Sequence, residues 1–332
     1  MSRERIVSGD AQGVDAVPSS SGMAVRPRLL KEYVGQKALV ERLSIALEAV
    51  KAREEPMEHV LLHGPPGLGK TTLAHVIAEE RGSTAWITSG PALTKAADLV
   101  GTLTKLGEHD VLLIDEIHRL PAAVEEYIYP AMEDFRVDFT VDSSMHAKVI
   151  TLSIKPFTLI GATTRAGLLT QPMLARFGIT HHLEYYPESD LFEIIVRAAA
   201  RLQIGPLDAS AIDVIASRSR GTPRVALRLL RRVRDFAQVR GDGSISVVTV
   251  GDALDLEGVD AIGLDELDRK YMRVLKDIYD GGPAGLEAIA ATLGDDSGTL
   301  EDVVEPYLLQ IGFLARTRQG RKLTAAGEAH IS

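Results

Sequence analysis

The sequence predicts an α/β fold, a parallel sheet with flanking helices, followed by a small helical domain and a C-terminal winged helix. Three observations support this prediction. Short apolar runs alternate with helix-like runs up to residue 186, an arginine-rich helical stretch follows, and the final stretch combines helical runs with two short strands. Apolar strands that alternate with helices are typical of a parallel sheet covered on both faces.

The expected strands are runs of almost continuous apolar residues, which indicate strands buried on both faces. Helical stretches lie between them and include residues 37–55 and 72–80. The strands are expected at residues 60–64, 84–88, 111–115 and 157–164.

The C-terminal stretch has the pattern of a winged helix. Apolar residues between Leu264 and Ile278 recur at helical spacing, and a second helix is expected over 286–294. A third helix is expected to begin at Thr299, with Asp302 in a capping box. Two short strands around a Gln-Gly turn complete this fold. The predicted domains are a flexible tail over residues 1–25, an α/β domain over 26–186, a small helical domain over 187–258 and the winged helix over 259–332.

The composition is that of an ordinary globular protein, with 45% hydrophobic and 25% charged residues. The absence of cysteine excludes disulfides, thiolate zinc sites and cysteine nucleophiles, and it fits a reducing compartment. No apolar stretch approaches the ~20 residues of a membrane span, so we expect a cytoplasmic protein without membrane contact. The net charge of −9 argues mildly against sequence-independent binding to nucleic acid, although local patches decide such binding.

The segment GPPGLGKTT, residues 64–72, is a complete phosphate-binding loop. Gly64, Gly69, Lys70 and Thr71 match the pattern G-x-x-x-x-G-K-S/T, and the loop lies between a predicted strand and a predicted helix. The glycines let backbone N–H groups face the phosphates, Lys70 reaches the β- and γ-phosphates, and Thr71 ligates Mg²⁺. We therefore expect the chain to bind a nucleoside triphosphate, ATP, with Mg²⁺.

Hydrolysis requires further groups, and the predicted strand over 111–115 ends in an acidic pair. Asp115 would hold Mg²⁺ and Glu116 would polarise the attacking water. The alternative is a pair of carboxylates that only starts a helix. Thr163 could touch the γ-phosphate or the water, or it could be a plain strand-end residue. The histidines, His118 among them, show no metal-ligand spacing and are expected in core or solvent positions.

Two arginines are candidates for contact with nucleotide phosphates, Arg176 with the γ-phosphate and Arg224 with a phosphate not specified further. Arg176, offered to the nucleotide of a neighbouring subunit, would neutralise charge in the transition state, but spacing alone favours a surface salt bridge. Arg224 lies in the first turn of a helix that Thr222 caps and Pro223 begins, where it could couple the nucleotide state to the small domain. The arginines that continue along this helix are interpreted as a structural or intersubunit surface rather than a DNA-facing ridge; they are Arg228, Arg231, Arg232 and Arg234.

The predicted hairpin is the best candidate for DNA binding, because its basic residues would grip the phosphate backbone without reading bases. The third helix carries Glu301, Asp302 and Glu305, which would repel phosphates. The alternative is a basic hairpin that only aids solubility. The basic residues of the hairpin are Arg316, Arg318, Arg321 and Lys322.

Taken together, the motifs resemble those of the AAA+ ATPases and, within them, those of the RuvB family of Holliday-junction branch migration motors. The resemblance extends from Arg26 to about Lys322. The blocks TSGPAL, AMEDF and EPYLLQ are typical of this family rather than of AAA+ ATPases in general. Further motifs that carry the resemblance are RPRLLKEYVGQ (26–36), GPPGLGKTT (64–72), DVLLIDEIHRL (110–120), PFTLIGATTRAGLL (156–169), RFGI (176–179) and RSRGTPRVALRLLRRVRDFA (218–237).

The resemblance implies roles for particular residues. Arg176 becomes an arginine finger that acts in trans, and DNA contacts fall on Arg316 and Arg321. A β-hairpin between residues 139 and 155 would meet the junction-binding partner RuvA, with Ile150 and Leu152 at its contact positions; the usual hairpin segment of the family is replaced here by VDSSMH at 141–146. The implied nucleotide contacts are Val25, Arg26, Gly67, Lys70, Thr71, Thr72, Glu133, Asp134, Phe135, Tyr186 and Arg224.

We therefore expect an ATP hydrolase that drives Holliday-junction branch migration in recombination and DNA repair. By resemblance it would form hexameric rings on double-stranded DNA, with RuvA at the four-way junction and RuvC in the resolving complex. A clamp-loader-like ATPase is the alternative, but such subunits usually carry a Ser-Arg-Cys motif and this chain has no cysteine. A protein unfoldase would need an aromatic pore loop, and residues 89–107 contain no aromatic residue. A binding module without turnover would lack Glu116.

Overall fold

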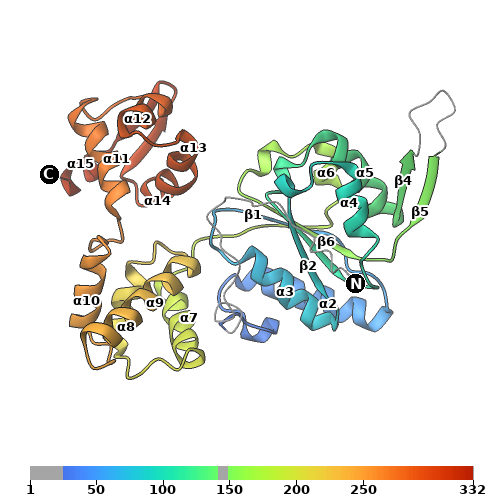
Figure 1. The fold of residues 1–332 in the computed structure, drawn as a ribbon, viewed down its shortest axis with the longest axis horizontal. Helices are drawn as coiled ribbons and strands as arrows, with labels where there is room; N and C mark the ends of the chain where they lie inside the picture. The colour runs from blue at the N-terminus through green and yellow to red at the C-terminus, as the bar shows by residue number, and fades with distance from the viewer. Residues whose placement is uncertain (1–24, 141–148, 332) are drawn as a thin grey trace, which may run out of the picture.

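The computed structural model describes residues 25–140 and 149–331 (Figure 1). The predicted tail, apart from Val25, lies outside these residues, as does the VDSSMH segment at 141–146. Three units follow one another along the described chain: an α/β unit, a bundle of helices, and a mixed unit that carries a small hairpin. This arrangement confirms the predicted fold class.

A five-stranded parallel sheet, in the order β2-β3-β6-β1-β7, forms the centre of the α/β unit in the described chain. Four of the strands match the predicted ones, and three of these are inner strands. The fourth, β2, forms one edge of the sheet, and its residues are half-buried or exposed, so its predicted burial on both faces is wrong. The strand β7 (Ile179–His182) forms the other edge and lies outside the prediction, because its residues alternate between half-buried and exposed and end in two histidines rather than forming an apolar run. The remaining strands are β1 (Val60–His63), β2 (Ala85–Ser89), β3 (Val111–Asp115) and β6 (Thr158–Thr163).

Helices cover both faces of this sheet, and successive strand residues fill two apolar cores. Leu62 and Leu113 pack into the first core, whereas Leu61 and Leu112 pack into the second. Because neighbouring side chains of a strand point to opposite faces, a continuous apolar run stabilises both layers. The helices are α2 (Lys37–Arg53), α3 (Lys70–Arg81), α4 (Ala96–Leu103), α5 (Ala122–Asp134) and α6 (Gln171–Ala175), with the short turns η1 (Leu30–Glu32), η2 (Gly90–Ala92), η3 (Ile117–Arg119) and η4 (Ala166–Leu168).

The helical unit continues the first core, and the last unit has its own core around the fully buried Tyr271. No helix in the described part of the chain is long and apolar enough to cross a membrane. The helical unit consists of α7 (Glu188–Arg201), α8 (Ala209–Ser217), α9 (Pro223–Arg240) and α10 (Val247–Leu256). The winged helix consists of α11 (Glu266–Asp277), α12 (Leu286–Leu293), α13 (Ser297–Thr299), the π-helical turn η5 (Leu300–Val304), α14 (Glu305–Gln310), β8 (Leu314–Thr317), β9 (Gly320–Leu323) and α15 (Ala325–His330).

The predicted start of the third winged-helix helix is wrong. The helix begins at Ser297, because the Asp296 carboxylate accepts a hydrogen bond of 2.9 Å from the Thr299 amide and caps it. Thr299 is therefore inside the helix, and no capping box links it to Asp302. The Asp302 carboxylate instead accepts a hydrogen bond of 2.6 Å from Arg165 of the α/β unit.

The predicted Gln-Gly turn of the hairpin is also wrong by one residue. Thr317 pairs with Gly320, so the turn consists of Arg318 and Gln319. Gly320 belongs to β9, where its φ of 139° and the carbonyl of Ala284 require glycine: a Cβ would lie 2.3 Å from that oxygen. This register places Arg318 at the tip of the wing.

A second hairpin lies outside the main sheet and projects from the α/β unit (Figure 1). Its strands are β4 (Arg136–Thr140) and β5 (Val149–Ser153), which pair in antiparallel fashion. Ile150 and Leu152 are 40% and 37% exposed. Because they are two residues apart on one strand, they lie on the same face and form a small exposed apolar pair.

Candidate active site and DNA-binding surface

The phosphate loop joins β1 to α3 at the carboxyl end of the sheet. Gly69 caps α3 with a φ of 97°, which favours glycine, and Lys70 is the first residue of the helix. The Lys70 ammonium is buried and donates hydrogen bonds to the carbonyl oxygens of Gly64 and Pro65, at 2.9 and 2.8 Å. The backbone thus holds the lysine in the loop, ready to exchange these carbonyls for phosphate oxygens.

Burial lowers the pKa of Lys70 to about 8, although the nearby Asp115 carboxylate raises it; the Arg224 guanidinium lowers it further. A bound phosphate would raise this pKa again, since an opposite charge favours the ammonium form. If Lys70 binds the phosphates, we expect ATP affinity to be at its full value below about pH 8 and to fall as the pH rises above it, where binding must take up a proton.

We predict that ATP affinity falls by up to about tenfold per pH unit above pH 8, the limit for uptake of one proton. Titration of the chain with a fluorescent ATP analogue from pH 6.5 to 9.5 measures this dependence. In the Lys70→Arg variant the guanidinium stays charged, so the ATP affinity that remains should not change with pH between pH 6.5 and 9.5. An equally steep fall in that variant would assign the dependence to another group.

The acidic pair lies at the carboxyl end of β3, where Asp115 is the last residue of the strand and Glu116 follows it. The Asp115 carboxylate accepts a hydrogen bond of 2.9 Å from the Glu116 amide, and Glu116 adopts a left-handed conformation with a φ of 48°. The Glu116 side chain makes no capping hydrogen bond to η3; it pairs instead with Arg119 at 2.8 Å and is about half exposed. Its carboxylate is therefore partly open to solvent and paired with Arg119, and it does not cap η3.

Thr163 ends β6 beside the phosphate loop, since its carbonyl oxygen accepts a hydrogen bond of 3.1 Å from the Gly64 amide. Its buried hydroxyl contacts the Nδ1 atom of His118 at 2.8 Å and accepts a hydrogen bond of 2.9 Å from the Arg165 amide. His118 thus connects the ends of β3 and β6. Sequence reasoning places this histidine only in the core or in solvent, because no local pattern marks a contact 45 residues away.

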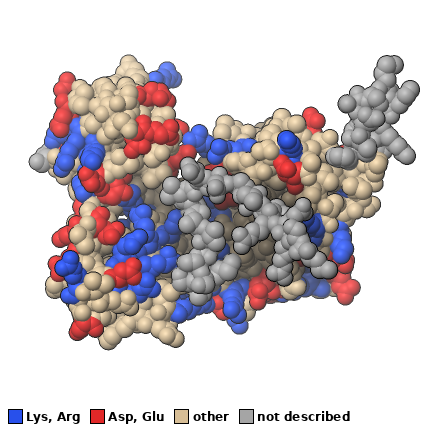
Figure 2. All heavy atoms as spheres, in the orientation of Figure 1, with Lys and Arg blue, Asp and Glu red and all other residues tan. Residues whose placement is uncertain are grey.

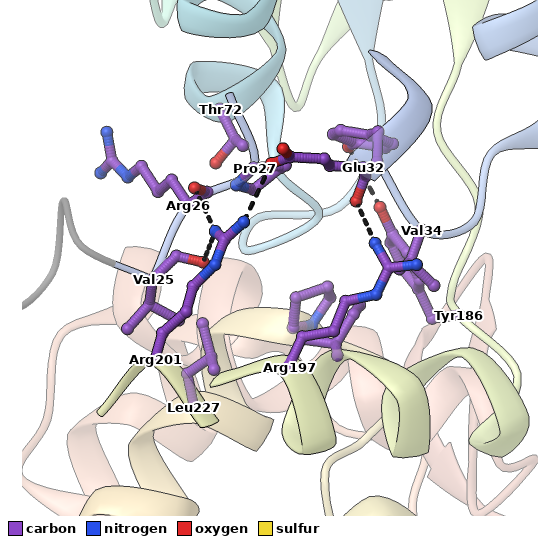
Figure 3. Close-up of a pocket in the computed structure, with 14 residues that line it drawn as sticks. Val25, Arg26, Pro27, Glu32, Val34, Thr72, Tyr186, Arg197, Arg201 and Leu227 are labelled. Atoms are coloured by element: carbon purple, nitrogen blue, oxygen red, sulfur yellow. Dashed lines mark hydrogen bonds and ion pairs between the residues drawn. The ribbon is translucent and has the colours of Figure 1, made fainter. Parts of the chain in front are cut away.

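A pocket opens beside the phosphate loop between the α/β unit and the helical unit (Figure 3). Arg197 and Arg201 extend from α7 and bind the backbone of the opposite wall: Arg201 donates to the carbonyl oxygens of Val25 and Arg26 at 3.1 and 2.5 Å. The pocket is lined mainly by apolar groups, which suits a nucleotide base. Its lining includes the expected residues Val25, Arg26, Thr72 and Tyr186, together with Tyr33, Val34, Ile194, Arg197, Arg201 and Leu227, which sequence reasoning misses.

Arg224 lies against the phosphate loop. Its amide donates a hydrogen bond of 3.3 Å to the carbonyl oxygen of Gly67, and a Cβ on Gly67 would come within 3.1 Å of the Arg224 Cβ. Thr222 and Pro223 occupy the cap and first position of α9, as predicted. The helical unit therefore presents Arg224 to the nucleotide site.

Arg176 and the expected nucleotide contacts at residues 133–135 form a separate cluster at the ends of α5 and α6. Arg176 pairs with Glu133 at 3.1 Å and lies 4.3 Å from the centre of the Tyr129 ring. Asp134 is the last residue of α5 and pairs with Arg136, and Phe135 is the C-cap of this helix. Phe135 and Tyr129 pack on the second core, whereas Tyr186 packs on the first, and the pocket lining includes none of the cluster. The surface salt bridge that spacing favours for Arg176 is present.

The wing arginines are held by a buried carboxylate. Glu305 is fully buried; its oxygens accept hydrogen bonds from Arg316 and Arg321 at 2.8 and 2.9 Å and from Tyr271 at 2.8 Å. Glu301 lies 3.8 and 3.6 Å from the same two arginines. The acidic third helix therefore orders the wing, and Arg318 and Lys322 remain exposed beside it.

The arginines of α9 gather on one face of the helical unit, where Figure 2 shows Lys and Arg concentrated. Arg232 lies 3.9 Å from Asp235 and 4.0 Å from Glu257, and Arg234 pairs with Asp235 at 2.8 Å. These pairs fit the structural interpretation of the stripe, while Arg228 and Arg231 extend the same surface.

A phosphate loop after β1, an acidic pair at the end of β3, a polar end on β6 and an arginine presented by a helical unit define a AAA+ P-loop ATPase. Three family models together match almost all of the described chain: the P-loop domain of the Holliday junction DNA helicase RuvB over residues 25–183, the RuvB AAA lid domain over 186–260 and the RuvB C-terminal winged helix domain over 261–332. The chain belongs to the RuvB family.

Known relatives agree with this membership. The chain is 53% identical over 307 residues to the Holliday junction branch migration complex subunit RuvB of Kosmotoga olearia, which covers 92% of this chain and 90% of the relative. The corresponding subunit of Ligilactobacillus salivarius is 52% identical over 329 residues, 99% of this chain and 96% of the relative. The solved structure of the Thermotoga maritima RuvB Holliday junction branch migration motor matches with a TM-score of 0.84 at 49% identity, over 93% of this chain and 98% of that chain.

Proposed function

We propose that this chain is the ATP-driven motor that moves DNA arms through a four-way junction held by RuvA. The observation that carries the proposal is the combination of a complete ATPase site with a winged helix whose wing is basic, in a chain of the RuvB family. The clamp-loader alternative accounts for the ATPase site but not for the match to the RuvB winged helix.

Within the site, Lys70 would bind the β- and γ-phosphates, and Glu116 would orient the attacking water with Thr163 and His118 beside it. Thr71 and Asp115 offer the hard oxygen ligands that Mg²⁺ prefers. The described residues contain no group of three or more metal-ligating side chains, which fits an ion completed by phosphate oxygens and water. Bound Mg²⁺ would neutralise charge on the phosphates.

The expected nucleotide contacts fall into two separate clusters, which supports an ATPase site shared between two subunits. Tyr186 lines the nucleotide pocket, and Lys70 and Arg224 lie beside it in the phosphate loop and at the start of α9. Phe135 and Tyr129, the ring that Arg176 contacts, pack on the other core. We infer that one subunit offers the second cluster to the pocket of its neighbour. Repeated head-to-tail contacts form a ring where the rotation between subunits closes, and we propose that here they close into a homo-hexamer.

The wing would bind the DNA backbone through Arg318 at its tip, together with Arg316 and Arg321. We predict that Arg318→Gln lowers duplex affinity at every sequence and reduces the slope of log affinity against log salt by about one, the value for one phosphate contact. Fluorescence anisotropy at several salt concentrations measures the slope. An unchanged slope would assign the DNA contact to another surface.

Arg321 should behave differently, because it is a partner of the buried Glu305. Arg321→Ala is expected to destabilise the winged helix by about 2–3 kcal/mol, since it removes one partner of a buried carboxylate and leaves Arg316 as the other. Thermal unfolding separates this loss of stability from the loss of affinity in Arg318→Gln, whose side chain is exposed. A stable Arg321→Ala variant would mean that Arg316 alone compensates the charge of Glu305.

The projecting hairpin is the proposed contact with RuvA. We predict that Ile150→Asp or Leu152→Asp weakens RuvA binding by about tenfold or more, since each places a charge in an apolar contact. Titration calorimetry with RuvA measures the loss, and ATP hydrolysis without RuvA should be unchanged. The exposed Ile45→Asp of α2 is the matched control; equal weakening by that variant would contradict the assignment.

The remaining assignments are proposals that follow from the family. We propose cytoplasmic action in DNA recombination and repair, with RuvC in the resolving complex. We also propose the domain boundaries given by the sequence, with an ATPase domain over 26–186, a lid over 187–258 and a winged helix over 259–332.

A further inference from the structure

We propose that Arg220 is a positioning residue that fixes the winged helix to the turn that presents Arg224, so that the DNA-binding unit moves with the nucleotide-sensing turn. The inference deepens the proposed motor function and rests on it for its DNA readout. It concerns a side chain that lies outside both the nucleotide pocket and the wing.

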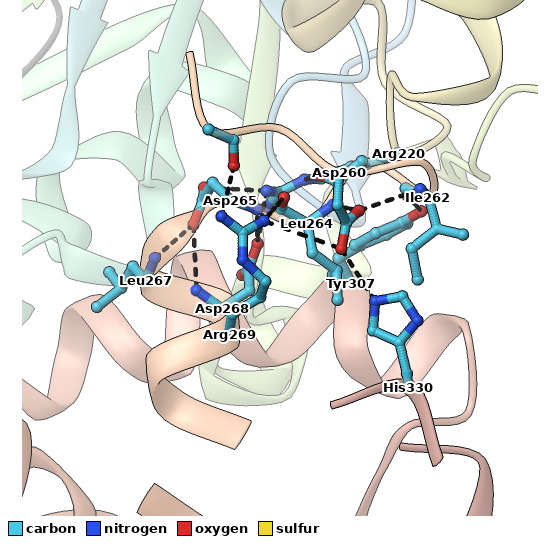
Figure 4. Close-up of polar contacts among 12 residues, drawn as sticks. Arg220, Asp260, Ile262, Leu264, Asp265, Leu267, Asp268, Arg269, Tyr307 and His330 are labelled. Atoms are coloured by element: carbon cyan, nitrogen blue, oxygen red, sulfur yellow. Dashed lines mark hydrogen bonds and ion pairs between the residues drawn. The ribbon is translucent and has the colours of Figure 1, made fainter. Parts of the chain in front are cut away.

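Arg220 lies in the loop between α8 and α9, just before the residues that begin α9. Its φ is 52° and that of Gly221 is 66°, so two left-handed residues in succession reverse the chain here. The side chain is only 9% exposed and points into the start of the winged helix (Figure 4). An arginine is seldom buried without specific partners.

The partners of Arg220 are the groups that set the start of α11. Its Nε donates to the carbonyl oxygen of Gly263 at 2.6 Å, and its Nη2 donates to Asp265 and Asp268 at 2.9 and 2.5 Å. Asp265 is the cap of α11, and Asp268 completes its capping box. Arg220 therefore binds the cap itself, which fixes both the position and the direction of the helix.

Two further contacts make the interface between this turn and the winged helix rigid. The Arg220 guanidinium lies 5.3 Å from the centre of the Tyr307 ring on α14, and the Tyr307 hydroxyl donates to the carbonyl oxygen of Ile262 at 2.5 Å. The backbones also come close, since a Cβ on Gly263 would lie 2.5 Å from the carbonyl oxygen of Arg218. The turn that carries Arg220 thus contacts two helices of the winged helix, α11 and α14.

On its other side, the same turn contacts the nucleotide site. The Tyr186 amide donates to the carbonyl oxygen of Gly221 at 2.8 Å, and the Arg224 amide donates to Gly67 of the phosphate loop at 3.3 Å. Residues 220–224 therefore connect the cap of α11 to the phosphate loop within five positions of the chain. A shift of Arg224 on nucleotide exchange would be transmitted to α11 through Arg220, because buried charge-assisted hydrogen bonds hold the two together.

A second contact joins the winged helix to the α/β unit, and it provides a matched control. Arg165 lies 3.0 Å from Glu301 and 2.6 Å from Asp302, but its side chain is 39% exposed. Figure 2 shows acidic residues of the winged helix facing basic residues of the α/β unit at this place. Exposed ion pairs of this kind contribute little to stability and break readily. The winged helix is therefore expected to move with the turn that carries Arg220.

The direct test measures the distance between the helical unit and the winged helix by electron spin resonance. The chain has no cysteine, so labels attach only at introduced sites. Val239→Cys on α9 and Ala326→Cys on α15 place labels on exposed positions of the two units. We expect one narrow distance distribution, unchanged between ADP and a non-hydrolysable ATP analogue, and a broad one once Arg220→Gln is added. Arg165→Ala should leave the distribution narrow, whereas a narrow distribution in Arg220→Gln would overturn the proposal.

Turnover provides the second readout. Arg220→Gln should keep ATP hydrolysis without DNA, and its stimulation by DNA should fall by about tenfold, within the range of coupling between two sites. Arg220→Lys should restore part of the stimulation because it keeps one charged contact. If Arg220→Gln loses both ATP hydrolysis without DNA and its stimulation by DNA, while the distance distribution between the labels stays narrow, the role of Arg220 is only structural. Failure of branch migration in the unmodified chain would instead refute the motor function and leave the label result intact.

Discussion

Replacement of Lys70 by alanine is expected to lower ATP hydrolysis by about a thousandfold, at the upper end of the loss for one charge-stabilising group in an active site. Lys70 is buried beside Asp115 and Arg224 at the end of the central strands, where only phosphate oxygens would replace its two carbonyl partners. The loss should include both ATP binding and the chemical step, because the ammonium contacts the phosphates in both states.

Phosphate release under saturating ATP measures this effect, with a binding titration beside it. Lys51→Ala removes a half-exposed lysine that pairs with Glu80 on the surface and should retain full activity. Activity of Lys70→Ala within about tenfold of the unmodified chain would contradict the assignment, since a loss that small corresponds to about 1.4 kcal/mol.

Replacement of Arg176 by alanine should lower hydrolysis by about a thousandfold or more, as expected for an arginine finger. The folded subunit should remain stable, because the Arg176–Glu133 pair is partly exposed and such pairs contribute about 1 kcal/mol or less. The defect should therefore appear in turnover and not in the melting temperature. Arg53→Ala, which removes another surface arginine, is the matched control.

Mixing the two inactive variants tests whether the site is shared. A Lys70→Ala subunit still offers Arg176, and an Arg176→Ala subunit still offers Lys70. An interface in which the first supplies the finger and the second supplies the nucleotide pocket therefore contains both residues. With equal mixing, about a quarter of the interfaces of a head-to-tail ring are of this kind. Recovery toward that fraction of activity supports a finger that acts in trans. No recovery on mixing would place Arg176 in a purely structural role.

The local sequence predicts those helices and strands whose formation depends mainly on their own residues. Apolar runs mark the inner strands, because burial on both faces requires apolar residues at every position. The edge strand β7 escapes this pattern, since its exposed positions carry residues such as His182. At the winged helix, Asp296 and Thr299 are equally plausible caps by residue type, and only the packed helix shows that Asp296 is the cap.

The residues that we propose as functional can be divided in the same way, into those that a local pattern marks and those that it does not. Lys70 and Asp115 follow from motifs, because their chemistry requires fixed spacing beside a strand end. His118 and Arg201 act through contacts between segments that lie far apart in sequence, so no local pattern marks them. Glu305 shows the limit most clearly: its charge predicts repulsion of DNA phosphates, whereas its burial makes it the partner of the wing arginines.

The most direct test of the motor function is branch migration of a synthetic four-way junction with the unmodified chain, RuvA, ATP and Mg²⁺. Labelled strands report conversion of the junction into separated duplexes, and Lys70→Ala serves as the inactive reference. We expect separated product that requires ATP, RuvA and Lys70. Steady ATP hydrolysis with no separated product would contradict the motor assignment and leave an ATPase with a clamp-loader-like role.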